Sequence, residues 1–305
     1  MQINVIIISN PLAGKEKQEI SYSSYSNINV VKEIDITTDN GDIMSILEES
    51  VYDLIFICGG DGTVSSVLSM LSQYDIQKPV AIIPLGTAND IAKSIYTTID
   101  IDSIINSISL DSLFEFDLGK INNHIFSYAF SFGYLTDVQY ETNQRIKNRL
   151  GFFAYLLNAL PKLPKIKSYK LKIKTDNTVI RGSYSFCSIL NTKSLANMIN
   201  FEDEYVSLDD GKFELLLVKT PMSPSKYFSS LYKLRNNIFD TSNVILISTK
   251  SLTIESSQQI DYGIDGEYGG KSNNFEFNVM NSAIRVAGPL SILMKGVEFY
   301  GKKCK

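Results

Sequence analysis

Three short, continuous apolar runs in the first third of the sequence constrain the fold most: Val5–Ile8, Leu54–Cys58 and Val80–Ile83. Runs rich in β-branched residues, without polar alternation, are typical of strands buried on both faces. Between and after them, residues 43–49 and 64–74 place apolar side chains at helical spacing. This alternation of strand, turn and helix predicts a parallel α/β sheet with crossover helices.

A change of pattern at about Phe114 divides the 305-residue chain. Beyond it the apolar runs are short and separated by turn residues, and Tyr169–Lys174 alternates strictly, as in a strand with one solvent-facing side. One apolar helix is expected over 150–160. We therefore predict an α/β domain over 1–120 and a β-sandwich-like second domain over 121–288. The other strands expected there are 126–132, 184–190, 213–218, 244–248 and 275–279.

The scarcity of histidine and cysteine limits the kinds of catalytic and metal site that this chain can form. The chain has one histidine, His124, expected at a turn before a strand, and three scattered cysteines, Cys58, Cys187 and Cys304. Zinc sites need about four such ligands at short spacing, and a Ser-His-Asp enzyme would depend on His124 alone. Scattered cysteines are typical of reduced thiols in a cytosolic protein. The acid–base and metal chemistry of an enzyme with this sequence must therefore rest on carboxylates.

Charge and hydropathy favour an ordinary globular protein. The net charge is −4 and 44% of the residues are hydrophobic, which does not favour a general nucleic-acid binder. The N-terminal run lacks the basic flank and cleavage site of a signal peptide, and no stretch approaches the roughly 20 apolar residues that cross a bilayer. We expect a cytoplasmic protein that reaches a membrane only from its surface.

The strongest local motif is Gly59-Gly60-Asp61-Gly62-Thr63, which follows a predicted strand and opens a helix. Three glycines let the backbone turn sharply and approach a ligand closely, and the amides at a helix N-terminus then face an anion. If these residues had only a structural role, they would form a tight turn in which Asp61 is the helix N-cap. Val64-Ser65 stand where phosphate loops need a lysine and dinucleotide loops a glycine, which excludes both motifs.

Two further polar loops follow predicted strands, Asn10–Lys15 after the first and Pro84–Asp90 after the third. Open α/β sheets bind ligands at the carboxyl ends of their strands. Three such loops in one sheet are more than turn chemistry explains. The sequence therefore predicts a ligand-binding edge on this sheet.

With these motifs the sequence resembles the bacterial diacylglycerol kinase and sphingosine kinase-like lipid kinases. The resemblance continues through Arg149–Leu156, Leu208–Phe213 and Ile264–Glu267, in order, over essentially the whole chain. Since Gly-Gly-Asp-Gly-Thr is also found in NAD kinases and phosphofructokinases, the second-domain motifs select the lipid kinases. The resemblance implies ATP- and Mg²⁺-dependent phosphorylation of a lipid hydroxyl, an NAD kinase-like first domain, and a return of residues 289–305 to that domain.

The resemblance also implies roles for individual residues. Glu267 matches the family's proton acceptor, and Asp265 and Asp61 are expected beside it in catalysis. The residues expected to line the ATP site are Asn10, Thr37, Gly59, Gly60, Asp61, Gly62, Thr63, Gly86, Thr87 and Asn89.

Two magnesium sites are implied in the same way. A structural ion would use the side chain of Asp210 and the carbonyls of Ser207 and Lys212. Magnesium prefers oxygen ligands and keeps several waters, and phosphoryl transfer asks mainly for positioning and charge neutralisation, so a histidine-poor site suffices. The carboxylates that match the catalytic magnesium network are Asp61, Asp90, Asp117 and Asp265.

The sequence departs from the family pattern at two places. Ser65-Ser66 replaces the usual Asn-Glu pair after the glycine motif, which removes an amide and a carboxylate beside the phosphates. Asn197–Phe201 replaces a glycine-rich stretch before the structural metal site. The first departure bears on activity and the second on the acceptor pocket.

A strongly basic segment around the predicted apolar helix favours contact with an anionic membrane. It carries +9 and the rest of the chain −13. Lys162, Lys165 and Lys167 are the expected membrane-facing residues, although a buried helix followed by a strand with a solvated lysine face would give the same pattern. The nine basic residues are Arg145, Lys147, Arg149, Lys162, Lys165, Lys167, Lys170, Lys172 and Lys174.

These observations predict a lipid kinase with diacylglycerol as the first acceptor, working from the cytoplasm on the inner face of the membrane. A sphingoid base, phosphatidylglycerol or another lipid alcohol remains an alternative acceptor. An NAD kinase-like enzyme and a non-catalytic nucleotide or lipid sensor remain alternative functions. The expected partners are ATP and a membrane lipid, without nucleic acid, while the choice of nucleotide and a homodimeric state stay open.

Overall fold

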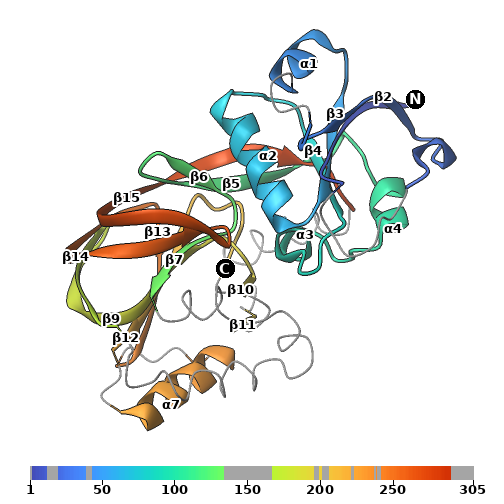
Figure 1. The fold of residues 1–305 in the computed structure, drawn as a ribbon. Helices are drawn as coiled ribbons and strands as arrows, with labels where there is room; N and C mark the ends of the chain where they lie inside the picture. Colours follow the sequence, from blue (N-terminus) through green and yellow to red (C-terminus); the bar gives the residue numbers. More distant parts are fainter. Residues whose placement is uncertain are drawn as a thin grey trace, which may run out of the picture. The chain divides into compact units, whose positions relative to one another are not determined.

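A computed structural model describes residues 2–11, 20–38, 43–133, 167–195, 199–200, 206–220, 223–236, 238 and 242–289 (Figure 1). The chain packs as two compact units, with boundaries between Asp117 and Leu118 and between Asn281 and Ser282. Unit 1 contains the chain up to the first boundary and again after the second, and unit 2 lies between them. The helix expected over 150–160, Lys162, Lys165 and the returning segment 290–305 lie outside the described residues.

Unit 1 is built on the predicted parallel sheet. Its strands lie in the order β2-β1-β3-β4, all parallel, and Val286 at the end of β15 pairs with Val80. The second strand was not predicted, because Ile28–Asp35 lies at the sheet edge and mixes apolar residues with exposed charged ones. The strand bounds are Ile3–Ser9 for β1, Ile28–Asp35 for β2, Leu54–Gly59 for β3 and Val80–Pro84 for β4.

Helices follow the strands of this sheet, as expected for crossover connections. The predicted helix over 64–74 begins three residues earlier, because the glycine loop itself forms its first turn, and it buries Val64, Val67, Leu68 and Leu71. The short helix over 101–106 was not predicted. The helical bounds are η1 Tyr22–Ser24, α1 Ile43–Glu49, α2 Asp61–Gln73, α3 Asp90–Ile95 and α4 Ile101–Asn106.

Unit 2 is rich in antiparallel strands. Strands β7 and β8 lie end to end between β9 and β14, and each of them pairs with both. The strand bounds are β5 Phe114–Ile121, β6 His124–Phe126, β7 Ala129–Gly133, β8 Tyr169–Thr175, β9 Val179–Leu190, β10 Ser194–Leu195, β11 Ile199–Asn200, β12 Phe213–Lys219, β13 Val244–Thr249, β14 Ser251–Ile264 and β15 Glu267–Val286.

The antiparallel, β-rich character predicted for the second domain is confirmed. The core of this unit is aromatic: the ring of Phe130 lies 5.1 Å from that of Phe275 and 5.5 Å from that of Tyr262. The period of the sequence reveals which residues face inward, whereas the placement of β8 beside β7 depends on its pairing with both β9 and β14.

Other expectations for unit 2 need smaller corrections. The single strand expected over 126–132 is two strands separated by a bend at Ser127 and Tyr128. One helix, α7 (Pro224–Arg235), was not predicted, although Ser223 caps it by accepting from the amide of Lys226. Within the described parts of the chain, no helix has the length and hydropathy needed to span a membrane.

Candidate active site

The glycine loops after β3 and β4 lie against each other at the carboxyl edge of the unit 1 sheet. A β-carbon at Gly60 would lie 3.1 Å from the α-carbon of Gly86, and one at Gly86 would meet the Gly60 backbone and the Asn89 side chain. The amide of Leu85 also donates to the carbonyl of Gly59 at 2.9 Å. Because glycine is needed for this approach, the two predicted loops form one surface of exposed backbone.

Asp61 joins these two loops. Its Oδ1 atom accepts a 2.9 Å hydrogen bond from the amide of Ile91, in the first turn of α3. Gly60, and not Asp61, is the N-cap of α2, which corrects the turn-only interpretation of Asp61. Asp90 is the first residue of α3 and is 4% exposed. The structure therefore brings Asp61 to the helix that begins with Asp90, as expected for two carboxylates of one site.

Asn89 holds the second loop in its unusual conformation. Its φ is 51°, in the left-handed region, where asparagine is one of the few tolerated residues. Its Oδ1 accepts from the amide of Gly86 at 2.9 Å, and its Nδ2 donates to the carbonyl of Gly86 at 3.0 Å. Asn89 therefore shapes the loop through its side chain.

The remaining residues expected around ATP lie at the ends of the same parallel strands. Asn10 follows β1 and is half-buried, and its backbone N–H donates to the carbonyl of Cys58 at 3.3 Å. Thr37 follows β2 and donates both its amide and its hydroxyl to Asp35 Oδ1, at 2.8 and 2.6 Å. In α2, Gly62 is exposed and Thr63 is buried; Thr87, in the loop after β4, is exposed. The carboxyl edge thus carries every residue of the expected ATP site.

Asp265 in unit 2 has a clear positioning role that sequence reasoning missed. It and Gly266 have φ values of 48° and 87° and form the two-residue turn between β14 and β15, as expected for an Asp-Gly hairpin. Its carboxylate accepts from the amides of Ser127, Tyr128 and Ala129 at 2.8–2.9 Å, and from the Ser127 hydroxyl at 3.2 Å. These bonds produce the bend that interrupts the strand expected over 126–132.

Glu267, the expected proton acceptor, is the first residue of β15 and is exposed. It pairs with Ile264 across the hairpin turn, so the Asp265 carboxylate fixes the turn from which Glu267 projects.

Asp117 belongs to unit 1: it is 0% exposed, and its Oδ1 accepts a 2.7 Å bond from the amide of Ser282. His124 is exposed at the start of β6 after a turn, as predicted.

The loop expected to hold a structural cation lies in unit 2 before β12. Asp210 Oδ1 accepts from the amide of Lys212 at 3.0 Å, and the Ser207 hydroxyl donates to Asp209 Oδ1 at 2.7 Å. Gly211 has a φ of 69°, which favours glycine. Burial raises the pKa of Asp210, and the neighbouring Asp209 charge adds to this rise. A cation at this loop would offset both effects.

Glu214, two residues after this loop, is a buried acid that sequence reasoning missed. It is 2% exposed, and its Oε2 atom has no hydrogen-bond partner. Burial, followed by the negative charge of Asp210, raises the pKa of Glu214 to about 9. In sequence the acid is hidden inside the run Phe213–Val218, whose other residues are all apolar, and no local pattern marks it as buried.

The oxygen-rich loops fit magnesium better than softer metals. The orphaned Oε2 of Glu214 and the half-buried Asp210 offer carboxylate oxygens, which magnesium prefers. Among the described residues, no three side chains of His, Cys, Asp or Glu come together as a metal centre. Magnesium that is held mainly by phosphates and water needs only one or two carboxylates, so the residues present fit this ion.

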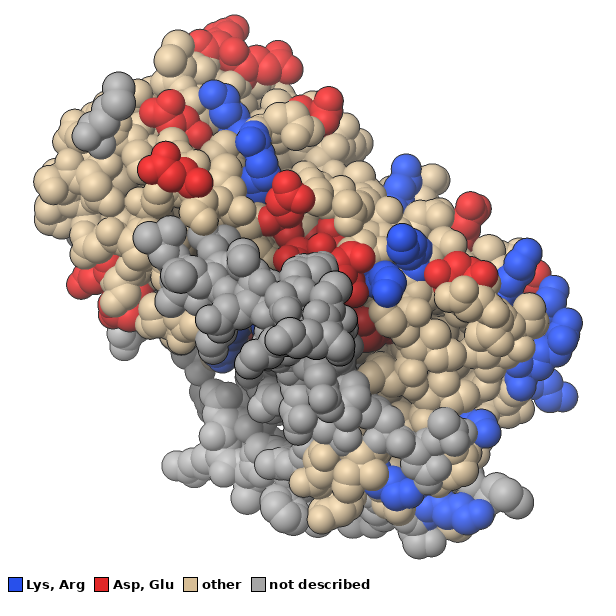
Figure 2. Space-filling view, turned by 180° about the vertical axis from the view of Figure 1, so that it is seen from behind, with Lys and Arg blue, Asp and Glu red and all other residues tan. Residues whose placement is uncertain are grey.

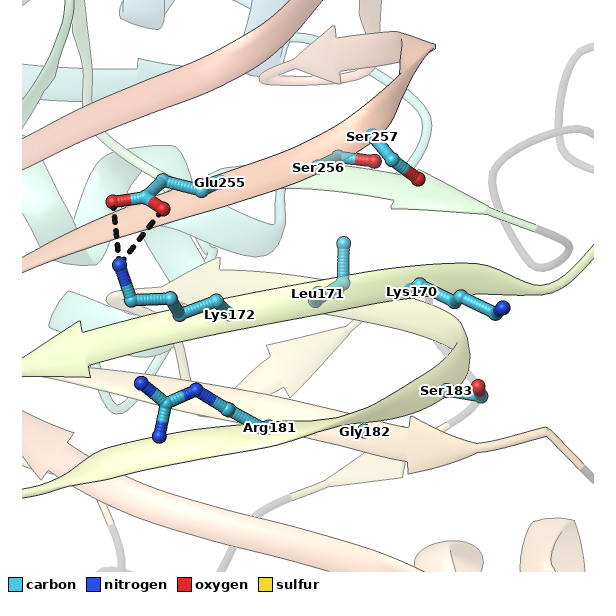
Figure 3. A pocket seen from close by; sticks show the side chains of 9 residues that line it. All are labelled: Lys170, Leu171, Lys172, Arg181, Gly182, Ser183, Glu255, Ser256 and Ser257. Carbon is cyan, nitrogen blue, oxygen red and sulfur yellow. Dashed lines mark hydrogen bonds and ion pairs between the residues drawn. The ribbon is translucent and has the colours of Figure 1, made fainter.

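A basic hollow of about 580 Å³ lies over β8, β9 and β14 (Figure 3). Lys170, Lys172 and Arg181 line it from neighbouring positions of β8 and β9. Lys172 is paired with Glu255 of β14 at 2.9 Å. Figure 2 shows Lys and Arg side chains gathered at the right-hand edge of the surface drawn there. The described end of the predicted basic segment therefore forms an exposed basic face.

Unit 1 is an α/β unit with an anion-binding edge, because it combines a parallel sheet, two glycine loops in contact and the N-terminus of α2. Many ATP-using phosphotransferases belong to this class. The chain belongs to the diacylglycerol kinase family: its residues 4–121 match the diacylglycerol kinase catalytic domain. The diacylglycerol kinase of Staphylococcus haemolyticus is 34% identical over 72% of this chain and 66% of its own length. That of Staphylococcus saprophyticus is 30% identical over 87% and 89%.

Solved structures show the same fold over nearly the whole chain. A diacylglycerol kinase structure from Bacillus anthracis aligns with a TM-score of 0.68 over 95% of this chain and 98% of its own, at 18% identity. A second structure from the same organism reaches 0.76 over 95% and 96%, at 20% identity. The shared fold therefore extends beyond the matched catalytic domain into the β-rich unit.

Proposed function

We propose that this chain transfers the γ-phosphoryl group of ATP to the hydroxyl of diacylglycerol and produces phosphatidic acid. The observation that carries the proposal is the contact between Gly60 and Gly86, bridged by Asp61, at the carboxyl edge of the sheet. The activity is that of the named relatives. Unit 1 would hold ATP, and unit 2 would supply the acceptor site.

In this proposal the backbone of the glycine loops carries the triphosphate. The amides at the start of α2 and the exposed glycine backbone offer hydrogen-bond donors to phosphate oxygens without side chains in between. Asp61 and Asn89 keep the two loops in register through Ile91 and Gly86. When bound, magnesium would neutralise phosphate charge, with Asp61 and Asp90 among the residues that would hold it.

The acceptor reaction needs one base. The lipid hydroxyl oxygen forms a bond to the γ-phosphorus, the bond between that phosphorus and the β–γ bridging oxygen breaks, and ADP leaves. The hydroxyl proton passes to the carboxylate of Glu267, which is exposed and therefore accessible to a substrate. Asp265 positions this carboxylate by fixing the hairpin turn.

Transfer of labelled γ-phosphate from ATP to lipids in mixed micelles tests the proposal. Diacylglycerol should be labelled faster than a sphingoid base, phosphatidylglycerol or NAD. Glu267→Gln should lose at least about 100-fold in kcat, the scale of a general-base contribution. Glu276→Gln, an exposed glutamate on the same strand, is the matched control and should keep its rate.

The other outcomes distinguish the alternatives. Labelling of NAD alone would replace the lipid kinase by an NAD kinase-like enzyme. ATP binding without transfer to any acceptor would favour a sensor. A Glu267→Gln variant with full rate would remove Glu267 from the mechanism.

The proposal places the protein at the cytoplasmic side of an anionic membrane, docked by basic residues. Lys170 and Arg181 line the hollow and are exposed, and Lys167 and Lys174 are exposed near the two ends of β8. Exposed basic residues are worth about 1 kcal/mol each near an anionic surface. Lys162 and Lys165 belong to the same basic segment of the sequence. The exposed basic residues on and beside β8 and β9 outnumber the one acidic residue that lines the hollow, Glu255, so this face carries net positive charge.

Binding to vesicles tests the docking. Binding to vesicles that contain phosphatidylglycerol should weaken steeply with salt, and again after charge reversal at Lys170, Lys174 and Arg181. Charge reversal at Lys250, an exposed residue in the turn between β13 and β14, is the control and should have a small effect. Binding that ignores salt and the three reversals would argue against this face.

A further inference from the structure

Tyr268 is an exposed aromatic residue beside the expected proton acceptor. It follows Glu267 directly on β15, and 59% of it is exposed. Gly269 and Gly270 come next in the chain and have no side chains that could cover the ring. Single exposed apolar side chains are common on soluble proteins, so the surroundings of Tyr268 must show whether it has a role.

The polar end of Tyr268 is held in place while its ring stays exposed. The hydroxyl donates to Asp261 Oδ1 of β14 at 3.1 Å, and Lys271 Nζ lies 3.1 Å from the same oxygen. These contacts bring the three side chains together on one side of the hairpin formed by β14 and β15. A tyrosine with a partnered hydroxyl and an exposed ring suits the boundary between water and lipid, because one end is polar and the other apolar.

This cluster of Tyr268, Asp261 and Lys271 shares the outward face of β14 with the basic hollow. The core residues of β14 all have even numbers: Leu252, Ile254, Ile260 and Tyr262. Because side chains alternate between the two sides of a strand, Glu255 and Asp261 both project away from the core. Glu255 lines the hollow, and Asp261 holds Tyr268. One outward face therefore extends from the hollow to the hairpin.

Positive charge continues along this face toward the hairpin. Lys167 lies just before β8, and the carbonyl of the next residue, Ser168, accepts from Gln258 Nε2 of β14 at 3.0 Å. Although desolvation opposes it, the pKa of Asp261 is lowered by its hydrogen-bond partners and by the nearby charges of Lys271 and Lys167. The basic face and the exposed tyrosine therefore form one continuous surface that is complementary to an anionic bilayer.

We propose that the ring of Tyr268 inserts at the headgroup level of an anionic lipid bilayer and sets the hairpin at the membrane surface. The inference rests on the proposed lipid kinase function, because it gives Glu267 access to an acceptor that stays in the bilayer. Adjacent residues of a strand point to opposite sides, so Tyr268 is a positioning residue and does not contact the lipid hydroxyl. The bonds to Asp265 keep the hairpin turn rigid, so anchoring the ring also places Glu267.

Fluorescence tests the insertion directly. The chain has no tryptophan, so Tyr268→Trp introduces a single reporter at the proposed contact. Its emission should shift to shorter wavelength on vesicles of phosphatidylglycerol and phosphatidylcholine, without ATP or diacylglycerol, and brominated acyl chains should quench it. Tyr74→Trp, at an equally exposed position after α2, is the matched control and should not shift. No shift at Tyr268, or an equal shift at both positions, would overturn the proposal.

Kinetics give a second readout that a merely structural role would not produce. Tyr268→Ala should raise the KM for diacylglycerol in vesicles at least about 10-fold, the smaller end of what burial of an aromatic side chain contributes. With a short-chain diacylglycerol dissolved as monomers, kcat/KM should stay within about twofold of wild type. Equal losses on both substrates would contradict an anchoring role.

A third variant separates the ring from the hydroxyl. Tyr268→Phe keeps the ring and loses only the bond to Asp261, so it should bind vesicles within about threefold of wild type. Binding by Tyr268→Phe that is as weak as binding by Tyr268→Ala would assign the effect to the hydroxyl and overturn insertion of the ring.

These outcomes are separate from those of the kinase proposal. If no lipid is phosphorylated but the emission of Tyr268→Trp still shifts on vesicles, the kinase function is wrong and the anchor stands. If Tyr268→Ala phosphorylates diacylglycerol in vesicles like wild type and the emission of Tyr268→Trp does not shift, the anchor is wrong and the kinase function stands.

Discussion

The carboxylate of Asp61 binds the helix that follows the neighbouring strand, since its Oδ1 accepts a 2.9 Å hydrogen bond from the amide of Ile91. This bond makes Asp61 both a candidate metal-site residue and a clamp between the two glycine loops. The two roles can be separated, because asparagine keeps an acceptor oxygen and loses only the charge.

Asp61→Ala and Asp61→Asn should therefore differ in stability but not in activity. Loss of the hydrogen bond from Ile91 in Asp61→Ala should cost about 1–2 kcal/mol in urea unfolding, whereas Asp61→Asn should lose less than about 1 kcal/mol. Both should lose lipid phosphorylation. Equal stability of the two variants would show that the bond to Ile91 contributes little.

Gly86→Ala should disrupt the contact between the glycine loops. The new methyl group would overlap the Gly60 backbone and lie 2.7 Å from Asn89 Oδ1, so the loops must separate. We expect a loss of about 1–3 kcal/mol in stability and a raised KM for ATP, measured by denaturation and by steady-state kinetics. Gln73→Ala, at the exposed end of α2, should change neither. An unaltered KM in Gly86→Ala would argue that ATP does not bind at this edge.

Asp265 should be needed for the fold of unit 2 as well as for activity. Its carboxylate serves three amides and a hydroxyl, so Asp265→Ala should lose about 2–4 kcal/mol. Asp265→Asn should be nearly as harmful, because its NH2 group would face N–H donors. Asp261→Asn removes the charge of the exposed pair with Lys271 but keeps an acceptor oxygen for the hydroxyl of Tyr268, so it should stay within about 0.5 kcal/mol of wild type in chemical denaturation. An Asp265→Asn variant of full stability would contradict this.

Cys58 and Cys187 should resist alkylation in the folded protein. Burial raises the pKa of Cys58 to about 12, although the hydroxyl of Tyr22 at 3.2 Å opposes this rise, and burial raises the pKa of Cys187 as well. A raised thiol pKa leaves less of the reactive thiolate at any pH below it, so both should react slowly at about pH 8. Thiol titration should gain at least these two reactive groups on unfolding in urea. Rapid reaction of Cys58 or Cys187 in the native state would contradict the burial described here.

The sequence predicts those parts of the fold that local patterns determine. The apolar runs at Val5, Leu54 and Val80 appear as β1, β3 and β4, and the loops after β3 and β4 meet as the parallel topology requires. β2 escaped prediction because an edge strand with exposed Lys32 and Glu33 lacks a buried-strand pattern. In these cases the local composition of a strand determines whether it can be predicted from the sequence.

Contacts between distant residues explain the remaining differences. The bend at Ser127 exists because Asp265, more than a hundred residues away, accepts three amides there. The position of β8 likewise depends on its pairing with both β9 and β14, and nothing within Tyr169–Thr175 specifies these partners. Glu214 was overlooked because its environment, and not its residue type, makes it unusual.

The placement of β7 and β8 between β9 and β14 also limits how this unit can vary. At the edge of a sheet, an inserted residue can slide one strand past its single neighbour. β7 and β8 each have a neighbour on both sides, so a slip of one residue would have to occur at both pairings and would turn core side chains such as Phe130 and Ile173 to the other face. Changes of length in this unit are therefore expected in the turns, although not in the two-residue hairpin of Asp265 and Gly266.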